Sequence, residues 1–105
     1  MVAGQRDVLV AAAVEHFGRL DVLVNNAGGS GPRPAMATSE RYFDTALKFN
    51  ATEPFLLSTL AARAMVDTTG EGAIVNISSR SADMTMTAMA AYGAGKAALN
   101  RMTQD

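Results

Sequence analysis

The chain has 105 residues, 49% of them hydrophobic, which fits one domain at most and is too apolar for a disordered polar tract. Its formal net charge is −1, because acidic and basic residues are nearly equal in number. No cluster of Lys and Arg is present, which argues against a nucleic-acid-binding surface. Cysteine is absent and His16 is the single histidine, which excludes disulfide frameworks, thiolate metal sites and histidine-based triads. We read no signal peptide and no membrane-spanning run. From the absence of cysteine we expect a cytoplasmic protein.

The first part of the chain is expected to form a helix, a strand and a loop. Residues 5–17 have helical periodicity, and Gly18 is a suitable stop signal. The apolar face of this helix is expected to comprise Val8, Leu9, Ala12 and Phe17. Residues 21–25 are a short β-branched run typical of a strand buried on both faces of a parallel sheet. Residues 26–38 are rich in glycine and proline and indicate a loop.

The second part of the chain repeats this alternation. Ser39 is expected to cap a helix that runs to about Phe49, and a second helix follows over residues 52–66, with Pro54 in its first turn. Residues 73–77 are expected to form another buried strand. A connecting segment, residues 78–89, leads to a last helix over residues 90–105.

Strands that alternate with helices indicate a parallel sheet in an α/β fold. Two strands are too few for such a sheet, because parallel strands need neighbours on both sides and helices on both faces. The pattern therefore predicts a slice of a doubly wound domain with exposed apolar strand edges.

Tyr92 and Lys96 lie four residues apart in the last predicted helix, so their side chains share one face. A free phenol is a poor acid at neutral pH, and a neighbouring ammonium group stabilises its phenolate form. The pair is therefore a candidate proton donor and acceptor. A surface lysine beside a half-buried tyrosine has the same spacing, so the spacing alone leaves both interpretations open.

Polar residues follow both predicted strands, where ligands approach a parallel sheet. The hydroxyl of Ser79, thirteen residues before Tyr92, could hydrogen-bond a substrate carbonyl; ordinary loop capping is the alternative. Residues 25–28, Asn-Asn-Ala-Gly, would let a flat ligand approach the backbone and could link neighbouring strands, or form a simple turn. Asn50 falls between the two middle helices, where its side chain could interrupt backbone pairing or mark a helix boundary.

Four features occur together in one order and at matching spacing. They are NNAG at Asn25–Gly28, Asn50, IVNISS at Ile74–Ser79 and YGAGK at Tyr92–Lys96. In these features the chain resembles the short-chain dehydrogenase/reductase family, and the resemblance covers nearly all of it. It implies a partial Rossmann-type doubly wound parallel sheet, central strands and helices only, with residues 1–105 as one partial NAD(P)-binding domain.

The resemblance also implies a role for each matching residue. Tyr92 would be the general acid/base, and Lys96 would assist it and hold the nicotinamide ribose. Ser79 would orient and polarise the substrate carbonyl, and Asn50 would hold a water molecule in the proton relay. Asn26, Ala27 and Gly28 would flank the cofactor, together with Tyr92 and Lys96.

The implied reaction is hydride transfer between NAD or NADP and an alcohol or ketone substrate. The loop Gly28–Pro34, GGSGPRP, is similar to the 7α-hydroxysteroid dehydrogenase branch, which indicates a steroid or a bulky secondary alcohol. By the same resemblance Met84, Met86 and Met89 would lie near the substrate mouth, where packing alone also explains them. The implied partners are further copies of the chain, through residues 52–66 and 90–105, without nucleic acid or membrane.

The sequence also departs from the family pattern. The glycine-rich turn between a first strand and helix is missing, as are the residue that selects NAD or NADP and the later substrate-binding helices. Gly95 stands where the family has serine or threonine. We expect an internal piece of a longer enzyme, with little or no activity alone. The alternative is an inactive fragment or remnant that associates with full-length relatives.

Overall fold

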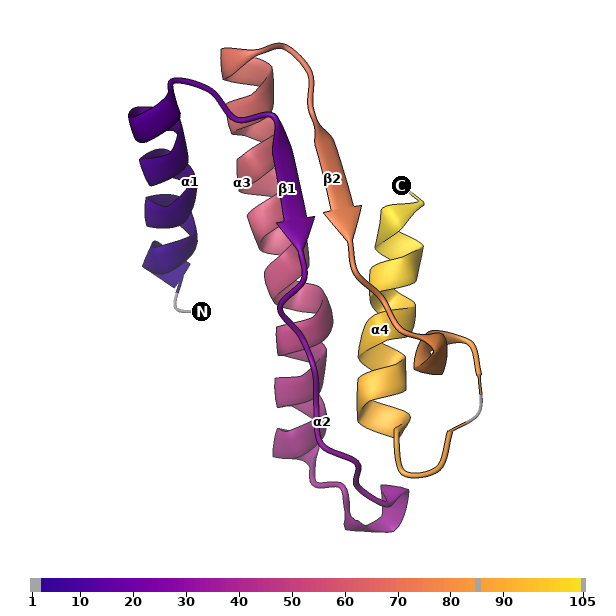
Figure 1. Cartoon of the computed structure of the whole chain (residues 1–105). Coiled ribbons are helices and arrows are strands. Elements are labelled where there is room, and N and C mark those ends of the chain that lie inside the picture. The colour runs from indigo at the N-terminus through magenta and orange to yellow at the C-terminus, as the bar shows by residue number, and fades with distance from the viewer. Residues whose placement is uncertain (1–2, 85, 105) are drawn as a thin grey trace.

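The computed structural model describes residues 3–84 and 86–104 and confirms the predicted α/β arrangement. Three long helices stand beside a two-stranded parallel sheet, with both strands running the same way (Figure 1). In chain order the main elements are α1 (Ala3–Phe17), β1 (Val22–Asn25), α2 (Glu40–Leu47), α3 (Glu53–Thr68), β2 (Ala73–Asn76) and α4 (Ala90–Thr103). The radius of gyration, 15.3 Å, exceeds the roughly 13 Å of a compact domain of this length. The described chain is therefore a flat slab.

The two strands pair in register, with Val22 opposite Ala73 and Asn25 opposite Asn76. Side chains alternate between the two faces of a strand, and here only one face is covered. Asn25 is buried, whereas Val22 and Val24 are 53% and 54% exposed. The expectation of strands buried on both faces is thus wrong for the described residues, because α3 and α4 supply apolar contacts on one face only.

Helix α1 forms over the predicted range and ends at Gly18, whose φ of +79° suits glycine after a helix. The expected packing face is wrong, because Val8 and Phe17 are 68% and 74% exposed. The half-buried apolar positions are Val10, Ala13 and Val14, which follow the contact of α1 with α3. In the sequence, α1 has two weakly apolar faces. The position of α3 determines which of them packs against the rest of the chain.

Helices α2 and α3 are continuous with each other. The side chain of Ser39 accepts a hydrogen bond from the backbone N–H of Tyr42 at 3.1 Å, which confirms the predicted cap. A π-helical turn, η2 (Lys48–Thr52), joins the two helices at the position of Asn50. The alternative of a helix boundary there is therefore wrong. The backbone stays helical through Asn50, and one turn of the helix is wider than an α-helical turn.

The buried hydrophobic residues of the described chain come from α2, η2, α3 and α4, and most of them are alanines. Leu99 on α4 is 1% exposed. Between β2 and α4 the chain forms a 3-10 turn, η3 (Arg80–Ala82), that also packs on α4. None of the helices in the described ranges is both long and apolar enough to cross a membrane.

Candidate functional site

Asn50 is completely buried, and its side-chain amide makes three hydrogen bonds. Its Nδ2 donates to the carbonyl oxygen of Ala46 at 2.9 Å and to that of Gly29 at 3.1 Å. Its Oδ1 accepts from the backbone N–H of Gly29 at 2.8 Å. The side chain therefore ties the loop after β1 to the widened turn η2, and places a polar group at the carboxyl end of the sheet.

Gly28 brings three of the predicted residues together. A methyl group built on its Cα would lie 2.8 Å from Asn50 Oδ1 and 2.8 Å from Lys96 Nζ. Such a distance is below van der Waals contact, so a side chain at this position would force at least one of the two groups to move. Asn50, Gly28 and Lys96, far apart in the sequence, thus form one cluster.

Lys96 holds its ammonium group at the end of β2. The residue is 3% exposed, and its Nζ donates to the carbonyl oxygen of Ile77 at 3.0 Å. The same atom lies 5.8 Å from the centre of the Tyr92 ring, one helical turn away. Tyr92 and Lys96 therefore lie next to each other on one face of α4, as their spacing predicts.

Ser79 lies at the start of η3 and is paired with Ser81. The two hydroxyl oxygens are 2.9 Å apart, and the backbone N–H of Ser81 donates to Ser79 Oγ at 3.2 Å. The capping alternative is therefore realised, and it leaves the hydroxyl fixed beside α4. Ser81 was not singled out from the sequence, because its place next to Ser79 depends on the 3-10 turn.

Asn26 and Ala27 lie apart from this cluster in the contacts that the structure gives. Both are exposed, and they line a cavity of about 280 Å³ between α1, β1 and α3. Leu9 and Phe49 lie on the same cavity wall. The roles of Asn26 and Ala27 toward a cofactor stay a prediction.

Asn25 forms the link between strands that the sequence suggested. Its Nδ2 donates to Asn76 Oδ1 at 2.8 Å and to Ser58 Oγ at 3.0 Å. The bonds join β1 to β2 and to α3 and hold the carboxyl ends of both strands in place. Asn76 lies within the IVNISS segment, and its position opposite Asn25 is the signal that could have identified it.

Two glycines of α4 allow close packing around the site. A methyl group on Gly95 would lie 2.9 Å from Asn50 Cβ, and one on Gly93 would lie 2.7 Å from the carbonyl oxygen of Ser81. Gly95, noted in the sequence only as a departure from the family, thus lets α4 approach η2. These contacts set the spacing between Lys96 and Asn50.

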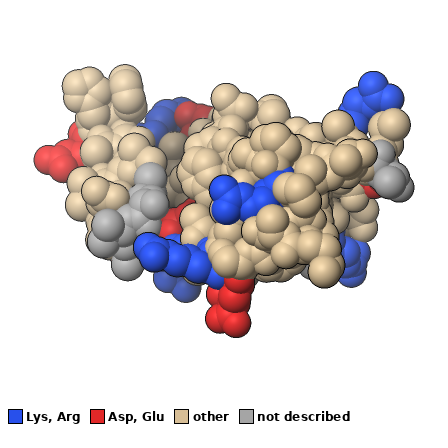
Figure 2. Space-filling view, turned by 90° about the horizontal axis from the view of Figure 1, so that it is seen from below, with Lys and Arg blue, Asp and Glu red and all other residues tan. Residues whose placement is uncertain are grey.

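The face toward which the strands run is mostly uncharged. Figure 2 shows uncharged residues over most of this end of the molecule, with Lys, Arg, Asp and Glu side chains scattered among them. Among the described residues no group of three or more His, Cys, Asp and Glu could hold a metal ion. The surface suits a small neutral ligand better than a polyanion.

The cluster fits the nicotinamide and ribose end of a dinucleotide. An ammonium group has three donors, and the bond from Lys96 to Ile77 uses one, so the others can reach sugar hydroxyls. Gly28 lets the loop after β1 approach the other two residues closely, since a methyl group on its Cα would lie 2.8 Å from Asn50 Oδ1 and from Lys96 Nζ. The residues present therefore fit this part of the cofactor.

Comparison with known proteins agrees with this geometry. The model of the short chain dehydrogenase family matches residues 3–105. The chain belongs to the short-chain dehydrogenase family. An oxidoreductase of Thermotoga maritima, itself uncharacterised, is 41% identical over 103 residues, which are 98% of this chain and 41% of that protein. The 7α-hydroxysteroid dehydrogenase of Escherichia coli is 36% identical over 94 residues, 89% of this chain and 36% of the relative.

A solved short-chain dehydrogenase superposes closely. The structure of a 7α-hydroxysteroid dehydrogenase complexed with NADH and 7-oxo glycochenodeoxycholic acid matches with a TM-score of 0.88 at 34% identity. The match covers 94% of this chain and 38% of that one. The chain thus spans 36–41% of the length of these family members. Members of the family use NAD or NADP as their hydride carrier.

Proposed function

We propose that this chain is the catalytic part of an NAD(P)-dependent oxidoreductase that interconverts an alcohol and a carbonyl compound. The observation that carries the proposal is the meeting of Asn50, Gly28 and Lys96. A methyl group built on the Cα of Gly28 would lie 2.8 Å from Asn50 Oδ1 and 2.8 Å from Lys96 Nζ. Packing alone would not require a buried ammonium at the carboxyl end of the sheet, since burying a charge is unfavourable without a function or a partner.

Tyr92 is assigned the proton transfer. When bound, a nicotinamide cofactor supplies or accepts the hydride at the substrate carbon. In the reduction direction, the hydroxyl of Tyr92 gives its proton to the carbonyl oxygen, and the alcohol forms. By the family resemblance Lys96, whose ammonium lies 5.8 Å from the ring centre, would assist this proton transfer. The same group would hold the ribose hydroxyls.

Ser79 and Asn50 are assigned positioning and proton supply. The hydroxyl of Ser79, fixed by Ser81 at 2.9 Å, would donate to the carbonyl oxygen and orient it. Asn50 would hold the water molecule that returns a proton to Tyr92, as the family resemblance implies. Asn26, Ala27 and Gly28 would flank the cofactor on the other side.

The finer assignments rest on the same resemblance. The substrate is proposed to be a steroid or another bulky secondary alcohol, and the cofactor NAD or NADP. The chain is proposed to act in the cytoplasm as a partial NAD(P)-binding domain of residues 1–105. Copies would associate through residues 52–66 and 90–105, where Phe55 and Val66 are 51% and 66% exposed.

A second candidate is an inactive chain that associates with full-length relatives. One observation favours it: the uncovered face of the sheet bears Val22, Val24, Val75 and Ile77, which are 43–54% exposed. Apolar strands of this kind gain free energy when another protein covers them. Coelution of the chain with a purified full-length short-chain dehydrogenase, without any turnover of its own, would favour this candidate.

Removal of one hydroxyl group tests the first proposal. The chain is mixed with NADH or NADPH and a set of ketones, and loss of nicotinamide fluorescence is followed. We expect a slow turnover by the wild type, which falls about 100-fold or more in Tyr92→Phe. Tyr42→Phe removes the same atom from the other tyrosine and should retain most of the rate. Turnover that persists in Tyr92→Phe would contradict the assignment.

A further inference from the structure

Arg6 and Glu53 form a buried ion pair outside the set of residues assigned to catalysis and cofactor binding. Arg6 Nη1 donates to Glu53 Oε2 at 2.5 Å, and the two side chains are only 13% and 11% exposed. The pair joins residues 47 positions apart, from the first turn of α1 to the first turn of α3. A buried pair fixes how two elements are placed, because either charge is strongly unfavourable there without the other.

Glu53 also closes the π-helical turn that carries Asn50. Its backbone N–H donates to the carbonyl oxygen of Lys48, across the whole of η2. Turns of this kind are rare and occur mostly as single wide turns inside α-helices, so contacts around η2 must favour the wide form. One such contact is on the page, because the side chain of Glu53 is held by Arg6 from α1.

The position of Asn50 depends on the width of this turn. Asn50 and Glu53 are both buried, and η2 is anchored on two sides, to the loop after β1 through Asn50 and to α1 through Glu53. An α-helical turn in place of η2 would rotate Asn50 by one residue, roughly 100°, relative to α3. Such a rotation would take the Asn50 amide away from Gly29.

The ion pair also lies beside the loop that is proposed to flank the cofactor. Glu53 lines the cavity of about 280 Å³ between α1, β1 and α3, and Asn26 and Ala27 line the same cavity. In Figure 1, α1 stands alongside α3, and contacts with α3 place it there. The ion pair therefore connects α1 both to η2 and to one wall of this cavity.

We propose that Arg6 and Glu53 are positioning residues of the oxidoreductase: their ion pair holds η2 in its wide form and so keeps Asn50 bonded to Gly29. In this role neither residue contacts the substrate or the cofactor. The inference rests on the proposed function for its effect on cofactor binding, whereas its effect on Asn50 is measured in the chain by itself. It gives a role at the site to α1, a helix that carries none of the residues proposed for catalysis.

The test removes one charge of the pair in the 105-residue chain and observes the side-chain amide of Asn50 by ¹⁵N NMR. Glu53→Gln keeps the shape of the side chain and removes its charge. We expect the Asn50 signals to move and their hydrogen exchange to become about ten-fold faster or more, because the bonds to Gly29 and Ala46 weaken. Asp21→Asn removes the carboxylate of an exposed ion pair and should leave these signals in place. Unchanged Asn50 signals in the folded Glu53→Gln chain would overturn the proposal.

A double variant separates positioning from stability. Glu53→Gln alone leaves the guanidinium of Arg6 buried without the opposite charge, so Arg6→Met/Glu53→Gln, which lacks both charges, should unfold at a higher urea concentration. We expect the Asn50 signals to stay displaced in the double variant although its stability recovers. Arg6→Lys keeps a positive charge opposite Glu53 and should give signals close to those of the wild type. Wild-type Asn50 signals in the double variant would overturn positioning by the ion pair.

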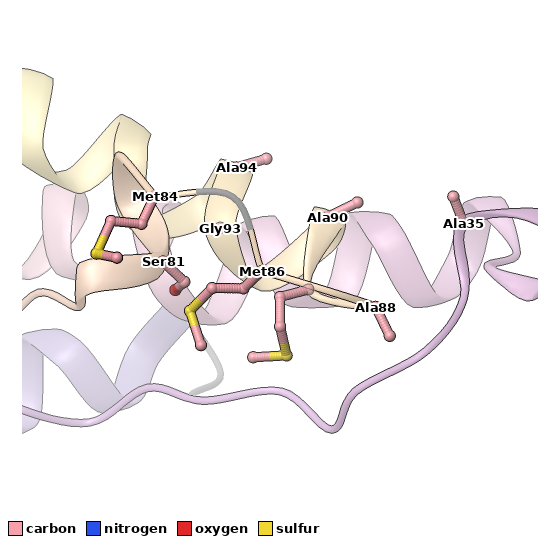
Figure 3. A pocket seen from close by; sticks show the side chains of 9 residues that line it. Ala35, Ser81, Met84, Met86, Ala88, Ala90, Gly93 and Ala94 are labelled. Carbon is pink, nitrogen blue, oxygen red and sulfur yellow. The ribbon is translucent and has the colours of Figure 1, made fainter.

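The methionines before α4 provide an internal reference. Figure 3 shows Met84 and Met86 in the wall of a separate cavity, beside Ser81 and the first turns of α4. Arg6 and Glu53 are not among the described residues that line this cavity. The ¹³C-methyl signals of Met84 and Met86 should therefore stay in place in Glu53→Gln. Displacement of these signals as large as that of Asn50 would mean a general loss of structure and would overturn a role confined to η2.

Titration with NADH separates this role from the proposed function. We expect NADH to shift the backbone amide of Gly29 about five-fold more weakly in Glu53→Gln than in the wild type, because the loop loses its bonds to Asn50. Displaced Asn50 signals in Glu53→Gln, together with a wild type that does not bind NADH, would support the positioning role and count against the oxidoreductase. NADH binding of equal strength in the two chains would support the oxidoreductase and overturn the positioning role.

Discussion

Asn50 and Gly29 exchange two hydrogen bonds between side chain and backbone. The N–H of Gly29 donates to Asn50 Oδ1 at 2.8 Å, and Asn50 Nδ2 donates to the carbonyl oxygen of Gly29 at 3.1 Å. The two hydrogen bonds join the loop after β1 to the π-helical turn η2. No helix or sheet contains both segments. Because the amide is completely buried, these bonds hold the glycine-rich loop at the site.

Asn50→Asp tests how much these hydrogen bonds stabilise the fold, because aspartate has almost the same shape as asparagine. The new side chain lacks Nδ2, so the carbonyl oxygens of Ala46 and Gly29 both lose their donor. We expect the free energy of unfolding to fall by about 2–4 kcal/mol, because buried polar groups are left unsatisfied. Urea denaturation measures the change.

Asn26→Asp is the control for that variant, since Asn26 is exposed. The same chemical change at an exposed position should alter the free energy of unfolding by about 0.5 kcal/mol or less. If the two variants cost the same, the hydrogen bonds of Asn50 do not stabilise the loop.

Gly28→Ala should disturb the site more than the fold. The new methyl group would lie 2.8 Å from both Asn50 Oδ1 and Lys96 Nζ, so at least one of these groups must move. We expect a loss of about 1–3 kcal/mol in the free energy of unfolding, and displaced NMR signals for the Asn50 side-chain amide. Gly4→Ala meets nothing within 4 Å and should not destabilise the chain. Unchanged Asn50 signals in Gly28→Ala would contradict the described cluster.

The pair of Arg19 and Asp21 gives a prediction for pH. The hydrogen bond from Arg19 lowers the pKa of the Asp21 carboxyl below its usual value. A carboxyl whose folded pKa is lowered adds stability above its unfolded pKa and loses it as the pH falls through the folded pKa. Both side chains are more than half exposed, so the effect on stability is small and screened by salt. NMR titration should show the pKa of Asp21 rising in Arg19→Gln.

One result of the pH titration would contradict the pairing of Arg19 with Asp21. An Asp21 carboxyl that titrates at the same pH in the wild type and in Arg19→Gln would mean that the pair is not formed in solution.

The kinds of secondary structure follow from local sequence. Ser39 caps α2 through a bond to Tyr42, and Gly18 and Gly70 follow helices with φ of +79° and +84°. These features depend on neighbouring residues, so a single sequence contains them. The packing face of α1 could not be predicted, because it depends on where α3 lies.

Some features of the candidate site also follow from local sequence, and others depend on how the helices pack. The neighbourhood of Tyr92 and Lys96 follows from helical spacing, whereas the meeting of Lys96 with Gly28 and Asn50 depends on packing between α4 and η2. The π-helical turn at Asn50 has no local signal, since a helix widens where its packing on both sides requires it. Ser81 gains its place only when η3 packs on α4.

The most direct test of the central claim is a titration of the ¹⁵N-labelled chain with NADH, observed by NMR. The signals of interest are the backbone amides of Gly28 and Gly29 and the side-chain amide of Asn50. We expect these signals to shift in a saturable way, with a dissociation constant roughly in the millimolar range, because the proposed contacts are to the nicotinamide and ribose alone. The shifts should be lost in Lys96→Met. A folded chain in which these signals stay fixed would contradict the account.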